Sequence, residues 1–247
     1  MASFPPIRTF LAAAERGVAA AMEAAYKLWL AAVRAAVMMP FNRWKLSPDP
    51  AGIWVATHIW DSRVERLIQD LQEVARHGWD FATIDLNINL PYDRSSSLLA
   101  DQLQRTRNLM VRTPGEVYRM VIAELAKGGT VREQADRVDA LLTWTGTENW
   151  PARARTVAVT EVTRAFNFGG LAAAFKAQEH LGQISKVWDA KRDDATRTEH
   201  RRAHGQKVPV SQPFQVGGEA LMAPGDPSGS PSNVINCRCH AEFRRSP

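Results

Sequence analysis

Apolar residues recur at the three- and four-residue spacing of amphipathic helices through most of the chain before residue 180. The first such stretch, residues 15–39, is rich in alanine and is interrupted by Glu23, Lys27 and Arg34. This pattern predicts one long helix. A membrane span is an alternative, but three charges within a stretch barely long enough to cross a bilayer make it costly.

The helix predicted over residues 15–39 carries two large aromatic side chains, Tyr26 and Trp29, among small alanines. Small residues permit close approach between helices, and large aromatic residues can anchor in a partner's surface. We therefore interpret residues 1–46 as an arm that docks on another protein, with an ordinary core helix as a nearly equal alternative. The prolines of residues 47–50 predict a hinge after this arm.

A second amphipathic pattern covers residues 53–74 and predicts a helix that stops near Gly78. The residues that follow, 79–112, mix alternating apolar positions with proline and serine, so the sequence does not assign their fold. Residues 47–112 therefore form a helical and irregular region.

Two capping-box signals lie further along, at residues 113–116 and 130–133, each with a threonine three positions before a glutamate. They predict two helices arranged as a hairpin. A longer helix is predicted from Asn149 to about His180. The glycine pair Gly169-Gly170 within it indicates close packing or a kink.

Apolar and polar residues alternate strictly near the end of the chain, over residues 235–244. This two-residue period predicts a half-buried strand in which Cys237 and Cys239 face the same side. A short helix is predicted around His200 and ends near Gly205.

The fold class is therefore α+β, with a predominantly helical N-terminal body and a small C-terminal αβ module of a short helix plus a few strands. The predicted segments are a 1–46 Ala-rich helical arm, a 47–112 helical and irregular region, a 113–182 helical hairpin with a long helix, and a 183–247 small C-terminal αβ module with the Cys-x-Cys strand.

Four residues of the terminal module have the chemistry of a zinc site: His200, His204, Cys237 and Cys239. Histidines four residues apart share a helix face, so two imidazoles and two thiols can converge into a tetrahedral Cys2His2 site. The alternative, which stands slightly ahead, is that the cysteines pack as small hydrophobic residues and His204 is a solvated helix residue. A disulfide between the cysteines is disfavoured, because a strand holds their side chains too far apart.

The same histidines raise the question of catalysis. His200 and His204 have the spacing of zinc peptidases, but Arg201 stands where the general-base glutamate belongs. A His/Asn/His nuclease is the better enzymatic alternative, since His200, Asn236 and His240 could position a metal-bound water against a phosphodiester. No strand–strand–helix order is recognisable around these residues, so we expect the chain not to be an enzyme.

Several short motifs follow one another in a fixed order along the second half of the chain. They are Thr160-Glu161-Val162 with Asn167-Phe168-Gly169, Trp188-Asp189, Arg197 three residues before His200, Gly205, Pro224-Gly225-Asp226, and Asn236-Cys237-Arg238-Cys239. In their order and spacing the chain resembles the phage head morphogenesis proteins, also called Mu F-like minor capsid proteins, of tailed bacteriophages and prophages. The resemblance covers roughly residues 113 to 243 and is strongest after Trp188.

In the family that the chain resembles, the long helix carries Glu161, Arg164 and Asn167, whose three-residue spacing places them along one side. We expect Glu161 and Asn167 to contact the terminal module around Arg197 and Arg238, where bidentate guanidinium pairing would fix its orientation. A set of exposed polar residues is the evenly weighted alternative.

Two carboxylates of the terminal module, Asp189 and Asp193, are further expected acceptors for Arg197 or Arg238, or groups that orient a ligating histidine. The resemblance thus implies a structural motif without catalytic residues. Its members are Glu161, Arg164, Asn167, Trp188, Asp189, Arg197, Pro224, Gly225, Asp226, Asn236 and Arg238.

The resemblance implies a minor head protein that acts in head, or procapsid, morphogenesis. Its expected partners are the phage portal protein, the scaffold or major capsid protein, and packaged DNA in weak contact, with no membrane. It is expected in the virion, inside the head near the portal, and in the host cytoplasm during assembly. The arm of residues 1–46 is our candidate for the portal contact.

Composition adds little to this picture. Thirty-one lysines and arginines against 26 aspartates and glutamates leave a net charge of +5. This charge favours loose association with polyanions such as packaged DNA, but it is too mild to indicate a dedicated nucleic-acid module. Zinc is the only cofactor that the sequence indicates.

Overall fold

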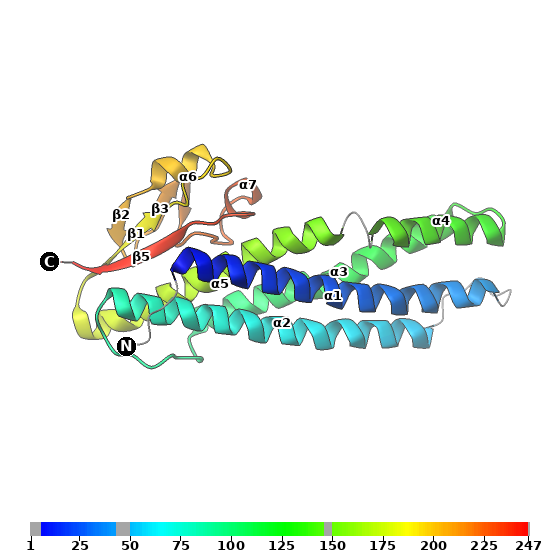
Figure 1. The fold of residues 1–247 in the computed structure, drawn as a ribbon, viewed down its shortest axis with the longest axis horizontal. Helices are drawn as coiled ribbons and strands as arrows, with labels where there is room; N and C mark the ends of the chain where they lie inside the picture. The colour runs from blue at the N-terminus through cyan, green and yellow to red at the C-terminus, as the bar shows by residue number, and fades with distance from the viewer. Residues whose placement is uncertain (1–5, 43–49, 146–149, 247) are drawn as a thin grey trace. The chain divides into compact units, whose positions relative to one another are not determined.

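Long helices precede a small C-terminal module that holds the strands, coloured yellow to red in Figure 1. The computed structural model describes residues 6–42, 50–145 and 150–246. In chain order its elements are α1 (Ile7–Asn42), α2 (Pro50–Asp85), α3 (Ser97–Ala126), α4 (Val131–Trp144), α5 (Trp150–Leu181), β1 (Ile184–Asp189), α6 (Thr198–Ala203), β2 (Lys207–Pro209), β3 (Phe214–Val216), β4 (Glu219–Leu221), α7 (Pro231–Val234) and β5 (His240–Arg245). The predicted α+β fold class is confirmed.

The chain divides into two compact units, each assembled from separated stretches of sequence. Unit 1 comprises Met1–Arg16, Gln69–Arg105 and Thr156–Pro247, and unit 2 comprises Gly17–Ile68 and Thr106–Arg155. The four segments drawn from the sequence remain a prediction. The predicted hinge over residues 47–50 lies outside the described residues, except for Pro50, with which α2 begins.

An aromatic cluster forms the core of unit 2. Tyr26 stacks on Trp150 with ring centroids 4.1 Å apart, and Trp60 meets both rings edge-on. The ring centroid of Trp29 lies 5.3 Å from that of Tyr26, and Trp29 completes the cluster. The indole nitrogen of Trp60 donates to the carbonyl of Met110 at 3.0 Å, so this buried polar group is satisfied.

The aromatic residues of α1 are therefore core residues, and their interpretation as exposed anchors was wrong. Tyr26 is 0% and Trp29 3% exposed, so neither can dock on a separate protein. Their large apolar area is removed from water inside unit 2, beside small neighbours such as Ala25. None of the described helices, α1 included, combines the length and apolarity needed to span a lipid bilayer.

Helix α3 runs through the first predicted capping box. It includes residues 113–116, so the helix start predicted there is wrong. Buried residues continue at helical spacing on both sides, from Met110 to Val117 and Val121, and this burial outweighs the local start signal. Residues 79–112, which the sequence did not assign, belong to α2 and α3, except for the connection between these two helices.

The second predicted capping box is present at the start of α4. The Thr130 hydroxyl accepts from the amide of Glu133 at 3.3 Å, and the Glu133 carboxylate accepts from the amide of Thr130 at 2.8 Å. The long predicted helix is also confirmed as α5, which ends at Leu181. Its predicted first residue, Asn149, lies outside the described residues.

In unit 1, α2 and α5 approach each other to backbone contact. A Cβ atom added to Gly78 would lie 1.9 Å from the carbonyl oxygen of Phe166, and one added to Gly169 would lie 1.9 Å from that of Ala75. The prediction that α2 stops near Gly78 was therefore wrong, because glycine here permits helix contact and does not end the helix. The close packing predicted at Gly169 is confirmed.

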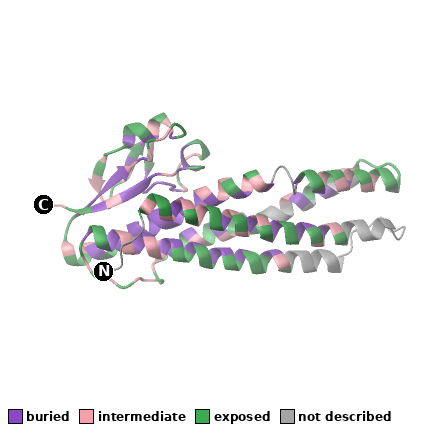
Figure 2. Cartoon of the chain, viewed as in Figure 1, coloured by how far each residue is buried: buried purple, intermediate pink, exposed green. Residues whose placement is uncertain are grey.

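The terminal module contains a three-stranded antiparallel sheet in the order β2-β1-β5 and a separate β3-β4 hairpin. Buried residues, purple in Figure 2, occur in β1, β3, β4 and β5, whereas β2 has none. The strand predicted over residues 235–244 is confirmed only in its second half, since β5 begins at His240, opposite Asp189. Asn236, at a φ of 58°, turns the chain before it.

We predict that Gly169→Ala destabilises the protein by at least about 2 kcal/mol, because its methyl group would overlap the backbone of α2. Gly17→Ala is the matched control: this exposed glycine of α1 has open space around its Cβ position, so alanine should stabilise by about 0.5–1 kcal/mol. Urea unfolding followed by circular dichroism measures both. Equal effects of the two changes would contradict the helix contact.

Candidate functional site

One face of α5 bonds the backbone of the terminal segment that leads into β5. The Thr163 hydroxyl donates to the carbonyl of Cys237 at 2.7 Å, and the Asn167 amide donates to that of Cys239 at 3.1 Å. In return, the amide of Ala241 donates to Asn167 Oδ1 at 2.8 Å. All of these groups are buried, so leaving any of them unpaired would be costly.

Thr160 extends the same face by one turn toward the start of α5. Its hydroxyl accepts from the amide of Asn236 at 3.0 Å. Positions 160, 163 and 167 lie three and four residues apart, so their side chains share one helix face. We call Thr160, Thr163 and Asn167 the α5 clamp, because together they hold the backbone between Asn236 and Ala241.

Glu161 and Arg164 form a buried ion pair beside the α5 clamp. Arg164 Nη1 lies 2.8 Å and 2.9 Å from the two carboxylate oxygens of Glu161, and its Nε donates to the carbonyl of Gly225 at 2.9 Å. Gly225 has a φ of 83°, and a Cβ there would lie 3.3 Å from Arg164 Cα. The turn of Pro224, Gly225 and Asp226 therefore rests directly on α5.

Asp226 holds this turn in shape. Its Oδ2 accepts from the amide of Met222 at 2.6 Å, and its Oδ1 accepts from the amide and hydroxyl of Ser228 at 2.9 Å and 2.8 Å. These are the local bonds that a short carboxylate side chain makes in turns. Asp226 is buried, and its role in the structure is to fix the loop between β4 and α7.

Arg197 and Arg238 bond groups within the terminal module. Arg238 makes a bidentate pair with Asp193, at 2.8 Å for each bond, which agrees with the expected carboxylate acceptor. Arg197 donates to the carbonyl of Ile235. Asn167 contacts the terminal module beside Arg238, as predicted, but it bonds the backbone of Cys239 and Ala241 and not a guanidinium group. Glu161 pairs with Arg164 of its own helix, so the predicted guanidinium pairing with Arg197 and Arg238 was wrong.

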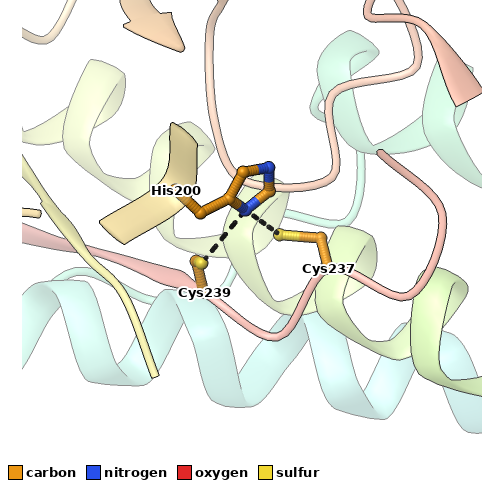
Figure 3. Close-up of side chains that lie close together, drawn as sticks. All are labelled: His200, Cys237 and Cys239. Carbon is orange, nitrogen blue, oxygen red and sulfur yellow. Dashed lines mark hydrogen bonds between the residues drawn. The ribbon is translucent and has the colours of Figure 1, made fainter. Parts of the chain in front are cut away.

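His200, Cys237 and Cys239 come together in the interior of unit 1 and are 1%, 1% and 2% exposed. Figure 3 shows both sulfur atoms directed at the same ring nitrogen, His200 Nδ1. The Sγ of Cys237 lies 3.7 Å and that of Cys239 3.4 Å from this nitrogen. Both cysteines are free. Trp188, also fully buried, meets the imidazole edge-on with ring centroids 5.5 Å apart.

The second ring nitrogen of His200 is fixed by Asn233. His200 Nε2 lies 2.8 Å from Asn233 Oδ1, while Asn233 Nδ2 donates to the carbonyl of Val216 at 2.8 Å and to Glu219 Oε2 at 3.2 Å. Two acceptors around Nδ2 identify the amide orientation, so Oδ1 must accept from His200 Nε2–H. Nδ1 then presents its lone pair to the two thiols.

The structure does not bring His204 to this cluster. Helix α6 ends at Ala203, and His204 follows in an extended conformation, so the two histidines do not share a helix face as predicted. His204 Nδ1 accepts from the amide of Ala190 at 3.2 Å. Three of the four predicted zinc ligands therefore come together, and the fourth lies elsewhere in the terminal module.

Charged and polar groups surround the carboxylate of Asp189 at the end of β1. Its carboxylate lies 2.8 Å from Arg8 Nη2, 3.2 Å from His204 Nδ1 and 3.2 Å from His240 Nε2. Burial lowers the pKa of His240, against the opposing effect of the Asp189 charge. His200 and His240 are thus buried in different surroundings, while Asn236 is exposed, so the structure does not support the His/Asn/His nuclease.

Sequence reasoning missed two residues that matter in the terminal module. Asn233 carries no pattern of its own within a loop of serine and proline, and only the fold brings it to His200. Lys186 is buried in β1, where its ammonium donates to the carbonyl of Met222 at 2.6 Å and lies 5.1 Å from the centroid of Phe214. Burial lowers the pKa of Lys186 to about 8. A lysine in a short strand that also holds Ile184, Val187 and Trp188 was the available signal.

Comparison with known proteins gives one family match. The model of the family described as Phage Mu protein F like protein matches residues 115–242, a little over half of the 247 residues. This range contains the α5 clamp, the Glu161–Arg164 pair and the His200 cluster. Neither the curated proteins nor the solved structures include a match to the chain.

Removing the Asn167 side chain should destabilise the protein strongly. In Asn167→Ala the carbonyl of Cys239 and the amide of Ala241 lose their partner inside unit 1, at a cost of about 1–3 kcal/mol for each buried group. Lys176→Ala, an exposed position on the same helix, is the control and should change stability by less than about 0.5 kcal/mol. Urea unfolding measures both; a loss at Asn167 as small as at Lys176 would refute the α5 clamp.

Proposed function

Because the chain belongs to the phage Mu protein F-like family of phage head morphogenesis proteins, we propose that it is a minor head protein that acts during procapsid assembly. The observation that carries this proposal is the family match over residues 115–242. Its proposed location is the virion, inside the head near the portal, after assembly in the host cytoplasm. Its proposed partners are the portal protein, the scaffold or major capsid protein, and packaged DNA in weak contact.

We propose a structural role and not an enzymatic one. Within the matched range, buried polar residues of α5 bond the chain's own backbone or one another. Arg164 bonds Glu161 and Gly225, Asn167 bonds Cys239 and Ala241, and these groups are buried. Such interactions fix the fold of a module, and they support a structural role for Arg164 and Asn167.

The portal contact needs a surface other than the buried rings of α1. Among its described residues, unit 2 exposes one large aromatic side chain, Trp144 at the end of α4, which is 42% exposed. The other exposed large apolar side chains of this unit are aliphatic: Leu28 on α1 and Leu109, Val111 and Met120 on α3. Tryptophan is the residue type most enriched among side chains that dominate binding energy at interfaces. We propose Trp144 as part of the portal contact, in place of the docking arm of residues 1–46.

The full chain, co-expressed with the portal protein of the same phage, should co-purify with it. Trp144→Glu should weaken this association by at least about tenfold, because a charge replaces an apolar anchor. Ile84→Glu is the matched control, since Ile84 is an exposed apolar residue of α2 in unit 1. Biolayer interferometry with the purified portal ring measures the affinities.

Two outcomes would count against this proposal. Absence of any portal association for the full chain would refute the portal as partner. Equal weakening by Trp144→Glu and Ile84→Glu would refute Trp144 as a contact residue, while it would leave the portal as partner intact. Circular dichroism of both variants checks that each retains its helices.

A further inference from the structure

We propose that His200, Cys237 and Cys239 bind a zinc ion through Nδ1 and the two sulfur atoms. The three residues come from α6 and from the loop before β5, and each of their ligand atoms lies within 4.8 Å of the others. Thiolate and imidazole ligands together select zinc among the common divalent ions of cells. This site goes beyond the proposed head function and does not depend on it.

The distances agree with a shared tetrahedral ion. Zn–S bonds of about 2.3 Å and Zn–N bonds of about 2.0–2.1 Å, at a tetrahedral angle, separate sulfur from nitrogen by about 3.6 Å. The observed separations of 3.4 Å for Cys239 and 3.7 Å for Cys237 lie on either side of this value. Both sulfur–nitrogen separations therefore differ from the tetrahedral value by only about 0.1–0.2 Å.

One thiol can donate to His200 Nδ1 while the other interacts with the neighbouring sulfur atom, but a zinc ion accounts for all three contacts together. An imidazole nitrogen has one lone pair in the ring plane, so Nδ1 can accept one good hydrogen bond, yet two sulfur atoms lie against it. A zinc ion uses that lone pair and both sulfur atoms at once. Two thiolates also neutralise the charge of Zn²⁺, which makes the bound site compatible with burial.

The groups around the three ligands hold them ready for the ion. Asn233 accepts from His200 Nε2–H and so keeps Nδ1 free to bind, as outer groups commonly do for ligating histidines. Thr163 and Asn167 bond the carbonyls of Cys237 and Cys239, which fixes the backbone from which both thiols project. The α5 clamp thus positions the sulfur ligands.

The burial of the ligands assigns the ion a structural role. Three protein ligands leave one tetrahedral position for a water molecule or another small ligand, but ligands that are 1–2% exposed exclude a macromolecular substrate. The ion would join α6 to the segment before β5, two parts of the module that lie about forty residues apart in the sequence. Metal binding would therefore add to the stability of the folded module.

The test measures zinc in the full chain, purified under reducing conditions without chelators and without a metal-affinity tag. We expect about one zinc ion per chain by plasma mass spectrometry. The zinc content of the Cys237→Ser and His200→Ala variants should fall to background. His204→Ala is the matched control and should keep its zinc, because His204 lies outside the cluster.

A second measurement tests the site in the wild-type chain, so that the proposal can be judged even if the ligand variants fail to fold. The wild-type chain, stripped with a chelator, should bind Co²⁺ with the near-ultraviolet sulfur-to-cobalt absorption of a thiolate site, and added zinc should raise its melting temperature. Asn233→Ala should retain the site but weaken zinc affinity about 10–100-fold in competition with a chromogenic chelator. Wild-type protein without zinc and without cobalt absorption, or equal zinc loss in His204→Ala and His200→Ala, would overturn the site.

Discussion

The terminal module of this chain depends on hydrogen bonds from helix side chains to the backbone of an edge strand and its approach. Strand β5 lies at one edge of the sheet, so its outer side has no neighbouring strand. Asn167 of α5 accepts from the amide of Ala241, and Asp85 at the end of α2 accepts from that of Phe243. Helices thus provide the partners that another strand would otherwise supply, and they protect the edge from pairing with other chains.

This constraint also explains why the distinctive residues of the matched range occur together. The turn around Gly225 and the Asn-Cys-Arg-Cys sequence, which begins eleven residues later, both rest on α5. Because Thr163 and Asn167 fix the carbonyls of the two cysteines, the thiols meet one nitrogen of His200. The shared cause is the α5 clamp, which determines the path of the segment from Asn236 to Ala241.

Periodicity predicted the long helices, the α+β class and the second capping box, because these depend on local spacing and on burial that the sequence pattern encodes directly. It failed at Gly78 and at residues 113–116, where contacts with other helices outweigh a local stop or start signal. The same limit applies to the zinc ligands: the Cys-x-Cys pair and His200 were predicted together, but the end of α6 at Ala203, which separates His204 from them, depends on tertiary structure. Asn233 carried no signal, since its role arises only from its position in space.

Native-state hydrogen exchange at the amide of Ala241 tests the α5 clamp most directly, because the partner of this amide is a helix side chain and not a strand. If the clamp holds the module together, this amide exchanges only with global unfolding, as slowly as amides in the centre of α5. The amide of Gly218, in the exposed turn between β3 and β4, provides the fast reference in the same spectrum. Exchange of Ala241 at the rate of Gly218 would contradict the account.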